Sequence, residues 1–241
     1  MPPRVESASE TPQGSRETKF VLADRAVPRI LGYLNARCHR DRSWPEGVVS
    51  SIYYDTPNWL HLREKLNGSR LKSKVRLRWY ASKHTAEPIG TGILELKAKD
   101  GALRNKLRFD TGIPAREIAQ TPLSAQRLRD VLDVMREQGL AIPRALLPAF
   151  EIRYVRYRFV DPSNGSRLSL DTQISISRTN TTRLPFSRPF SLRESVFEVK
   201  GELDDLPASL SEFRAFGCRK EAFSKYSSCE RFIRYAHQRA S

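Results

Sequence analysis

The chain has 241 residues and a formal net charge of +15, because 42 lysines and arginines stand against 27 aspartates and glutamates. With 39% hydrophobic residues it can build a large core, which excludes wholesale disorder. No apolar run approaches the roughly 18 residues of a membrane span, and three cysteines without paired spacing favour a reducing compartment, so we expect a cytoplasmic protein. Arginines outnumber lysines, and arginine binds phosphate or carboxylate oxygens bidentately, so we expect an anionic partner.

The predicted elements begin after a polar N-terminal segment. Residues 1–14 lack periodicity and are expected to be a disordered tail, and residues 15–241 are expected to form one domain. Apolar spacing predicts four helices, which cover 24–40 with Asp24 as N-cap, a segment from Ser124 to Gly139, about 207–216 and about 224–238. Asn67-Gly68 and Asn164-Gly165 predict two-residue hairpin turns between strands. Long runs of strands with few helices indicate an α+β fold with a mainly antiparallel sheet.

Charged and apolar residues alternate along most of the predicted strands. In the segment 74–80, Lys74, Arg76 and Arg78 share one face, while Val75, Leu77 and Trp79 share the other. The same alternation places further charged residues on one face of their strands: Glu17, Lys19, Glu95, Lys97, Lys99, Arg156, Arg158, Arg167, Asp171, Glu198 and Lys200. The pattern Glu-x-Lys therefore occurs three times in strand-like context.

This alternation has two interpretations. An ordinary antiparallel sheet also turns its charged face to water, and that interpretation stays open for each strand. If the sheet closes instead, the charged face becomes a lumen, and the apolar face packs against helices outside. A lumen lined by lysine and arginine has strong like-charge repulsion, which a chain of phosphates would relieve. The few acids would then orient basic side chains or hold a divalent ion.

Several segments together resemble a known family. The chain is similar to the VTC (vacuolar transporter chaperone) domain, a member of the triphosphate tunnel metalloenzymes and a relative of the CYTH proteins. The similarity runs from about residue 15 to the C-terminus. The segments that carry it are, in chain order, Ser51–Pro57, Leu62–Gly68, Lys74–Tyr80, Leu94–Lys97, Tyr154–Arg156, Arg167–Thr172, Phe197–Lys200 and Ser224–Ser227.

The resemblance implies a fold, an activity and a set of site residues. The fold would be a closed antiparallel β-barrel of about eight strands with a charged lumen and helices packed outside. Members of the VTC type transfer the terminal phosphate of ATP to a growing polyphosphate chain with Mn²⁺ or Mg²⁺. By resemblance, the phosphate-binding residues would be Lys19, Lys65, Arg76, Arg78, Lys97, Arg156, Arg167 and Lys225. Glu198 would coordinate the metal ion, and the catalytic set would be Arg76, Arg78, Lys97, Arg156 and Glu198.

Other charged residues of the same faces receive weaker assignments. Glu17 and Glu95 would hold Lys19 and Lys97 in place or act as weak metal ligands, and Asp171 is as well explained by a structural role. Arg63, Lys74, Arg158 and Lys200 share the charged register without an assigned role.

Two departures from the family pattern bear on the activity. CYTH hydrolases and cyclases often begin with Glu-x-Glu-x-Lys, but Ser15 stands where the first Glu would be, which favours the VTC type over a two-metal hydrolase. The eukaryotic polymerase type has Arg at the position of Lys65, so bidentate geometry is lost there.

Three functions remain open on the sequence alone. The first is the polymerase, with ATP and inorganic polyphosphate as partners and no specific nucleic acid. The second is a tripolyphosphate or nucleoside triphosphate hydrolase of the same fold. The third is a non-catalytic polyphosphate or nucleic-acid binder, which is disfavoured because Trp79 and Tyr157 lie on apolar strand faces rather than as stacking platforms. A membrane or protein partner stays open.

Overall fold

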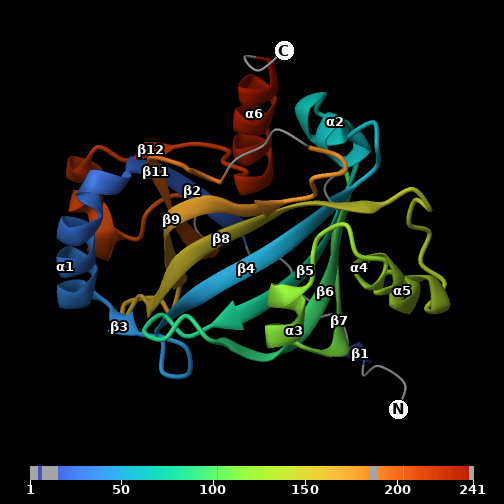
Figure 1. The fold of residues 1–241 in the computed structure, drawn as a ribbon. Coiled ribbons are helices and arrows are strands. Elements are labelled where there is room, and N and C mark those ends of the chain that lie inside the picture. The colour runs from blue at the N-terminus through green and yellow to red at the C-terminus, as the bar shows by residue number, and fades with distance from the viewer. Residues whose placement is uncertain (1–4, 7–15, 102, 185–188, 203, 239–241) are drawn as a thin grey trace.

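The fold is built on one antiparallel sheet whose neighbours are β1-β7-β6-β5-β4-β8-β9-β11-β2-β12, with β10 on β9 and β3 on β8 (Figure 1). The computed structural model describes residues 5–6, 16–101, 103–184, 189–202 and 204–238. The longer strands are β2 (Arg16–Ala23), β4 (Glu46–Asp55), β5 (Leu71–Ala81), β6 (Pro88–Asp100), β7 (Leu103–Pro114), β8 (Leu147–Val160), β9 (Arg167–Thr179) and β11 (Glu194–Gly201). The two-residue strands are β1 (Val5–Glu6), β3 (His39–Arg40), β10 (Phe190–Ser191) and β12 (Arg219–Lys220).

Helices cover the outer face of the sheet in two groups. The first packs with the β4–β7 side and comprises α3 (Ala115–Gln120), α4 (Arg127–Asp130) and α5 (Asp133–Glu137). The second packs with β2, β8, β9 and β11 and comprises α1 (Val27–Arg37), the preceding 3₁₀ turn η1 (Asp24–Ala26) and the 3₁₀ segment η2 (Ala208–Phe216). Apolar residues at every second strand position, such as Leu77 and Phe197, supply the surface against which these helices pack.

The opposite, inner face of the sheet is apolar only toward one end. There α2 (Leu60–Leu66) and α6 (Lys225–Gln238) contribute to a third core cluster with inner-face residues such as Tyr53 and Ile152. We use the name inner face for the side of the sheet that carries Lys19, Arg76 and Glu198. Beyond the third cluster, this face is charged.

Strand β9 serves both faces because of a bulge. The pairing of β8 with β9 shifts register between Arg153 and Val155, where Gln173 has a positive φ of 53°. Before the bulge Leu170 packs on the outer face, and after it Ile174 packs on the inner face, although both have even numbers. The bulge thus separates the charged part of the inner face from its apolar end.

Gly92 allows the close contact between α3 and the sheet. A Cβ at this position would lie 2.2 Å from Cδ1 of Ile118, so a side chain on this part of β6 would force the buried Ile118 side chain to move.

Several element boundaries differ from the sequence predictions. The predicted helix 24–40 is η1 followed by α1 and ends at Arg37, because residues 39–40 pair with β8. Asp24 is not an N-cap, because it is the first residue of η1, and the N-caps of η1 and α1 are Ala23 and Ala26. The helix expected from Ser124 is two short helices, α4 and α5, and α2 and α3 were not predicted.

The two Asn-Gly pairs also behave differently from the prediction. Asn67 is the C-cap of α2, and Gly68, with a φ of 68°, follows that helix rather than joining two strands. Asn164-Gly165 does lie between β8 and β9, but within the longer connection 161–166.

The predictions for 207–216 and 224–238 are confirmed by η2 and α6. Residues 5–6 of the expected tail pair with β7, while residues 1–4 and 7–15 lie outside the described residues.

Closure of the sheet stays a prediction. Within the described residues, no hydrogen-bonded pairing joins the β1–β7 side to the β2–β12 side. No helix in the described part of the chain is long and apolar enough to cross a membrane.

Candidate functional site

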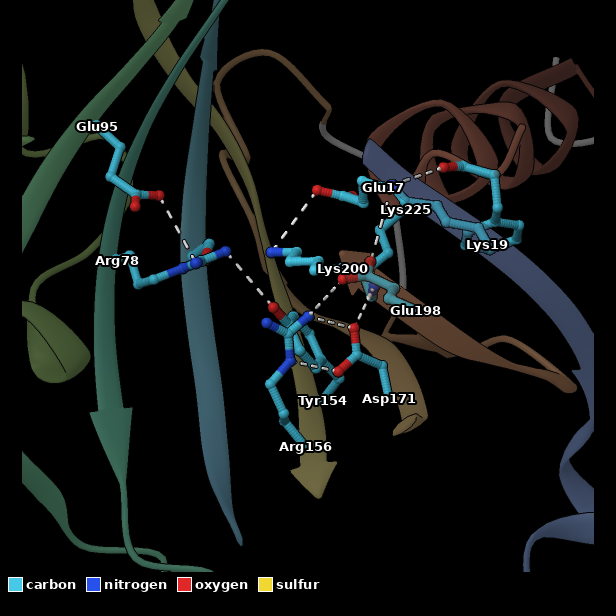
Figure 2. A network of polar contacts seen from close by, with 12 residues as sticks. Glu17, Lys19, Arg78, Glu95, Tyr154, Arg156, Asp171, Glu198, Lys200 and Lys225 are labelled. Carbon is cyan, nitrogen blue, oxygen red and sulfur yellow. Dashed lines mark hydrogen bonds and ion pairs between the residues drawn. The ribbon is translucent and has the colours of Figure 1, made fainter. Parts of the chain in front are cut away.

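Charged side chains from distant strands converge over the inner face (Figure 2). Figure 2 shows Arg78 and Glu95 projecting from one side of the sheet toward Glu17, Lys19 and Glu198 on the other. The two sides lie close enough to influence one another, because Glu17 on β2 raises the pKa of Lys97 on β6 and Lys19 on β2 lowers that of Lys74 on β5. The sheet therefore curls around this charged space.

The first cluster surrounds Glu198, which is buried. The Nη2 atom of Arg156 lies 3.3 Å from Oε2 of Glu198, and the Nζ atoms of Lys225 and Lys19 lie 3.4 Å and 3.7 Å from Oε1. Burial alone would raise the pKa of Glu198, but the positive charges of Lys225, Arg156 and Lys19 hold it well below the ordinary value. Glu198 is thus ionised but held only by long contacts.

Asp171, in the same cluster, is held much more tightly. Nε and Nη2 of Arg156 donate to its two oxygens at 2.5 Å and 2.6 Å, and Nζ of Lys225 lies 2.5 Å from Oδ2. Both cations also face the ring of Tyr154, at 5.4 Å for Arg156 and 4.9 Å for Lys225. Asp171 therefore fixes the two cations in place, and the structure supports the structural role for this residue.

The second cluster is organised by Glu95, which is 1% exposed. Its carboxylate lies 2.5 Å from Arg76, 3.1 Å from Arg108, 3.2 Å from Lys106 and 3.6 Å from Arg78. The hypothesis that Glu95 holds Lys97 is not supported, because residues on one strand face stand farther apart than the cross-strand neighbours Arg76 and Arg108. Glu95 is a positioning carboxylate with no free oxygen for a metal ion.

In the cluster around Glu95, Arg76 and Arg78 are also held by hydroxyl groups of other strands. Nη1 of Arg76 donates to the Tyr53 hydroxyl at 3.3 Å, and Arg78 donates to the hydroxyls of Ser51 at 3.2 Å and Tyr154 at 3.4 Å. The hydroxyls that accept these long hydrogen bonds lie on β4, which neighbours β5, and on β8, the next strand beyond it, so each guanidinium is oriented without being neutralised by a second carboxylate.

Lys97 has no close counter-ion among the residues that the structure describes. It is exposed to solvent, and no carboxylate of the described residues lies within ion-pair distance of it. The positive charge of Arg76 is the main cause that lowers the pKa of Lys97 well below the ordinary value, followed by partial desolvation. Such a residue favours an anionic ligand, because the ligand would supply the missing negative charge.

The predicted site residues are not all brought together. Lys65 lies on α2, and desolvation and the charges of Lys72 and Lys19 lower its pKa, which places it at the edge of the charged space. Arg167 is exposed at the start of β9, opposite Lys200 of β11, and shares its face with Asp171. It joins neither cluster, so its role in phosphate binding stays a prediction.

Sequence reasoning missed three kinds of participants. Tyr53 and Tyr154 accept hydrogen bonds from Arg76 and Arg78 and so orient them. The alternation predicts that both tyrosines lie on the inner face, but it does not predict which residues they contact. Lys106 and Arg108 continue the alternation of charged residues on β7. Lys74 follows from the register of β5, but the alternation alone gives it no role.

Helix α6 brings Lys225 to the site and is anchored by Asp55 of β4. The Tyr226 hydroxyl donates to Oδ2 of Asp55 at 2.5 Å, and the same carboxylate accepts from the backbone N–H groups of His61 and Leu62 in α2. The Tyr226 ring stacks on Tyr53 and Phe150 at centroid distances of 5.0 Å and 5.3 Å. The start of α6 is thereby fixed over the inner face.

At the other end of the strands the charged face opens into a cavity of about 490 Å³. Tyr80 and Arg158, which continue the inner faces of β5 and β8, line this cavity together with the exposed Trp44. The charged face therefore reaches the surface at that end.

The residues present are compatible with one shared divalent ion. No group of three histidines, cysteines or carboxylates among the described residues could hold a metal by itself. Glu17 and Glu198 nevertheless lie on neighbouring strands of the same face and interact electrostatically, and Lys19 and Lys200 lower the pKa of Glu17 to about 2 against burial and Glu198. Since Mg²⁺ is commonly bound by one or two carboxylates plus substrate phosphates, these residues fit an ion that arrives with a phosphate ligand.

The sequence of this chain matches a known protein family. Residues 15–232 match the family model of the VTC domain. The chain belongs to the VTC domain family. The resemblance to the VTC domain drawn from the sequence is confirmed, and so is the α+β fold with a large antiparallel sheet.

Several solved structures are similar to this VTC domain at low sequence identity. A Hippeastrum protein, named as an adenylyl cyclase with a dominant triphosphatase activity, is 16% identical with a TM-score of 0.50 and covers 88% of this chain and 92% of its own. A Bacillus halodurans protein named as an adenylate cyclase is 14% identical (TM-score 0.49, 88% and 95% covered). A Pyrococcus horikoshii protein is also 14% identical (TM-score 0.46, 88% and 97% covered). No curated protein matches the chain.

Proposed function

We propose that this VTC domain is a metal-dependent polyphosphate polymerase that transfers the terminal phosphate of ATP to a growing polyphosphate chain. The observation that carries the proposal is the inner face, where lysines and arginines greatly outnumber the carboxylates Glu17, Glu95, Asp171 and Glu198. Family membership supports the choice of a phosphorylated substrate. Closure of the sheet into a tunnel around the chain of phosphates belongs to the same proposal.

The residues would act by position and charge. Arg76 and Arg78, oriented by Glu95, and Arg156 and Lys225, oriented by Asp171, would bind phosphate oxygens on opposite sides of the charged space. Lys97, Lys19 and Lys65 would add charge along the chain. Phosphoryl transfer needs such preorganised charge more than it needs covalent chemistry from the protein.

Glu198 would hold the Mn²⁺ or Mg²⁺ that accompanies the phosphates, with Glu17 beside it. When bound, the ion would neutralise charge on the phosphate oxygens. Because the present contacts of Glu198 are all 3.3 Å or longer, its carboxylate can exchange them for a metal ligand at lower cost than Asp171.

The test is formation of polyphosphate from ATP and Mn²⁺, with product length read on a gel. We expect Arg76→Ala and Glu198→Ala to lower the rate by about 10²-fold or more, since each removes a charged contact at the transferred group. Arg37→Ala is the control, because this arginine pairs with Glu212 on the exposed outer surface. Unchanged rates in both site variants would refute the site.

Hydrolysis of tripolyphosphate or a nucleoside triphosphate is the alternative, and the triphosphatase activity printed for the Hippeastrum protein favours it. The same gel separates the two, because a hydrolase releases orthophosphate without long chains.

A nucleic-acid binder is disfavoured further, since Trp79 is 2% exposed and Tyr157 is 9% exposed, so neither ring can stack on a base. The three free cysteines support the cytoplasm as the proposed compartment.

A further inference from the structure

Lys74 lies where the charged inner face meets the start of α6. Its Nζ atom donates to Oγ of Ser224 at 3.0 Å and stands 5.6 Å from the centre of the Tyr226 ring. Ser224 directly precedes α6, and its Oγ also accepts from the backbone N–H of Ser227 at 3.5 Å. Lys74 therefore sits against the N-terminal end of a 14-residue helix, which carries partial positive charge.

The charged groups around Lys74 are almost all cations. Lys19 of β2, Lys65 of α2 and Arg76 of β5 each act on it electrostatically, and Lys97 of β6 is its cross-strand register partner. Desolvation is the largest cause that lowers the pKa of Lys74, followed by these cations, and the result is about 7. The lysine stands in a place that disfavours its own charge.

The nearby carboxylate, Asp55, does not compensate for this. It raises the pKa of Lys74 only as the least of the named causes. Its oxygens already accept hydrogen bonds from the backbone of Thr56, His61 and Leu62 and from the Tyr226 hydroxyl. No carboxylate in the described part of the chain lies within ion-pair distance of Lys74. A negative charge that stabilises protonated Lys74 would therefore have to come from a bound ligand.

We propose that Lys74 is a further phosphate-binding residue, which extends the track of cations from Arg76 to the start of α6 and takes up a proton when a phosphate chain binds. The inference rests on the proposed function for the choice of ligand. Lys19, Lys65 and Lys74 approach the start of α6 from three different elements. The phosphates that they bind would therefore lie farther along the polyphosphate chain than those bound by Arg76 and Arg78. The proton comes from solvent and stays on the Lys74 amine while the phosphates are bound.

Two measurements with inorganic tripolyphosphate test this, both without metal. In the first, lysine side chains carry ¹³C at Cε, and the Lys74 resonance is assigned by its loss in Lys74→Arg. We expect its midpoint near pH 7 in the free protein and above about 9 with tripolyphosphate, since the bound anion favours the charged amine. A free-protein midpoint near the ordinary value, or one that tripolyphosphate does not move, would overturn the proposal.

The second measurement is affinity by calorimetry at pH 7. Lys74→Met should weaken tripolyphosphate binding about tenfold or more, because a charge-assisted contact is lost. Lys74→Arg should retain most of the affinity, which shows that the site still folds. Lys220→Met is the matched control, because it makes the same substitution on the exposed edge strand β12. Equal losses in Lys74→Met and Lys220→Met would contradict a local contact.

The outcomes separate this proposal from the proposed polymerase. If the wild-type protein makes polyphosphate and Lys74→Met binds tripolyphosphate as well as the wild type, only the role of Lys74 fails. If binding depends on Lys74 but no polyphosphate forms, the polymerase fails and Lys74 stands. If the wild-type protein does not bind tripolyphosphate, both are overturned.

Discussion

At the scale of single residues, the carboxylates of the inner face fall into two kinds. Glu95 and Asp171 make contacts as short as 2.5 Å to arginine, whereas Glu198 makes only longer ones. A carboxylate that is already saturated by cations orients them and keeps them from repelling one another. A carboxylate with long contacts can bind a further ligand. The division indicates a positioning role for Glu95 and Asp171 and supports the proposed metal-binding role of Glu198.

This division predicts the effect of Glu95→Gln. The change removes the negative charge that four basic side chains share in a buried position, so we expect a loss of about 3 kcal/mol in the free energy of unfolding. Urea unfolding without ligand measures it. Glu117→Gln is the control: that carboxylate pairs with Arg127 at the exposed surface, where a loss within about 0.5 kcal/mol is expected. Equal losses in the two variants would show that Glu95 is not the centre of a cluster.

The alternation of charged and apolar residues sufficed to predict which side chains share the inner face. It could not predict their partners, because those depend on which strands are neighbours. Glu95 is two residues from Lys97 in the sequence, yet its partners come from β5 and β7. The sequence does not predict a role for Lys74 for the same reason: its environment is made by α2, α6 and β2, which are distant in the chain.

At the scale of elements, α6 links the apolar end of the inner face to its charged part. Tyr226 stacks in the third core cluster and binds Asp55, while the preceding residue, Lys225, points to Asp171 and Glu198. Adjacent residues of a helix point in different directions, so one turn can serve both purposes. The stability of this turn and the position of Lys225 are therefore coupled.

Tyr226→Phe tests how α6 is anchored. It keeps the stacked ring but removes a buried hydrogen bond to a carboxylate, so the free energy of unfolding should fall by about 2 kcal/mol. Tyr33→Phe is a matched control, since the buried Tyr33 hydroxyl makes no hydrogen bond among the described residues, so its removal should not lower the free energy of unfolding. Chemical denaturation of both variants gives the comparison. A neutral Tyr226→Phe would mean that ring stacking alone anchors the helix.

Helix ends and turns were the least predictable elements. Asn67-Gly68 has the composition of a hairpin turn, but the preceding residues 60–66 form a helix whose N–H groups are satisfied by Asp55. A seven-residue helix has little periodicity of its own, so tertiary contacts decide its formation. The long helix α6, with a clear apolar stripe, was predicted close to its observed bounds.

At the scale of the whole molecule, the two kinds of basic residues are distributed differently. The excess of arginine predicts an anionic partner, and Arg76, Arg78 and Arg156 lie on the inner face. Many other arginines pair at the outer surface, as Arg37 and Arg214 do. Lysines are concentrated on the inner face and at its edges: Lys19, Lys65, Lys72, Lys74, Lys97, Lys99, Lys106, Lys200 and Lys225. Composition could not show this, because it records numbers and not positions.

This concentration of lysines predicts how stability depends on pH. The folded-state pKa values of Lys74 and Lys106 are lowered to about 7 and about 8, mainly by desolvation, and that of Lys97 is also lowered, so the folded protein binds fewer protons than the unfolded chain between about pH 7 and 10. When the unfolded state binds more protons, stability rises with pH. The melting temperature of the ligand-free protein should therefore increase from pH 7 to pH 9.5.

At acid pH, carboxylates with lowered pKa values determine how the stability of the folded protein depends on pH. The pKa of Glu17 is lowered to about 2, so its contribution is complete above about pH 4.5 and is lost as the pH falls toward 2. Tripolyphosphate should flatten the alkaline rise, because bound phosphates supply the charge that the lysines lack and raise their pKa values. Melting curves at a series of pH values, with and without tripolyphosphate, measure both effects. A melting temperature that falls from pH 7 to 9.5 without ligand would contradict a strained, cation-rich inner face, because paired lysines lose stability as they deprotonate.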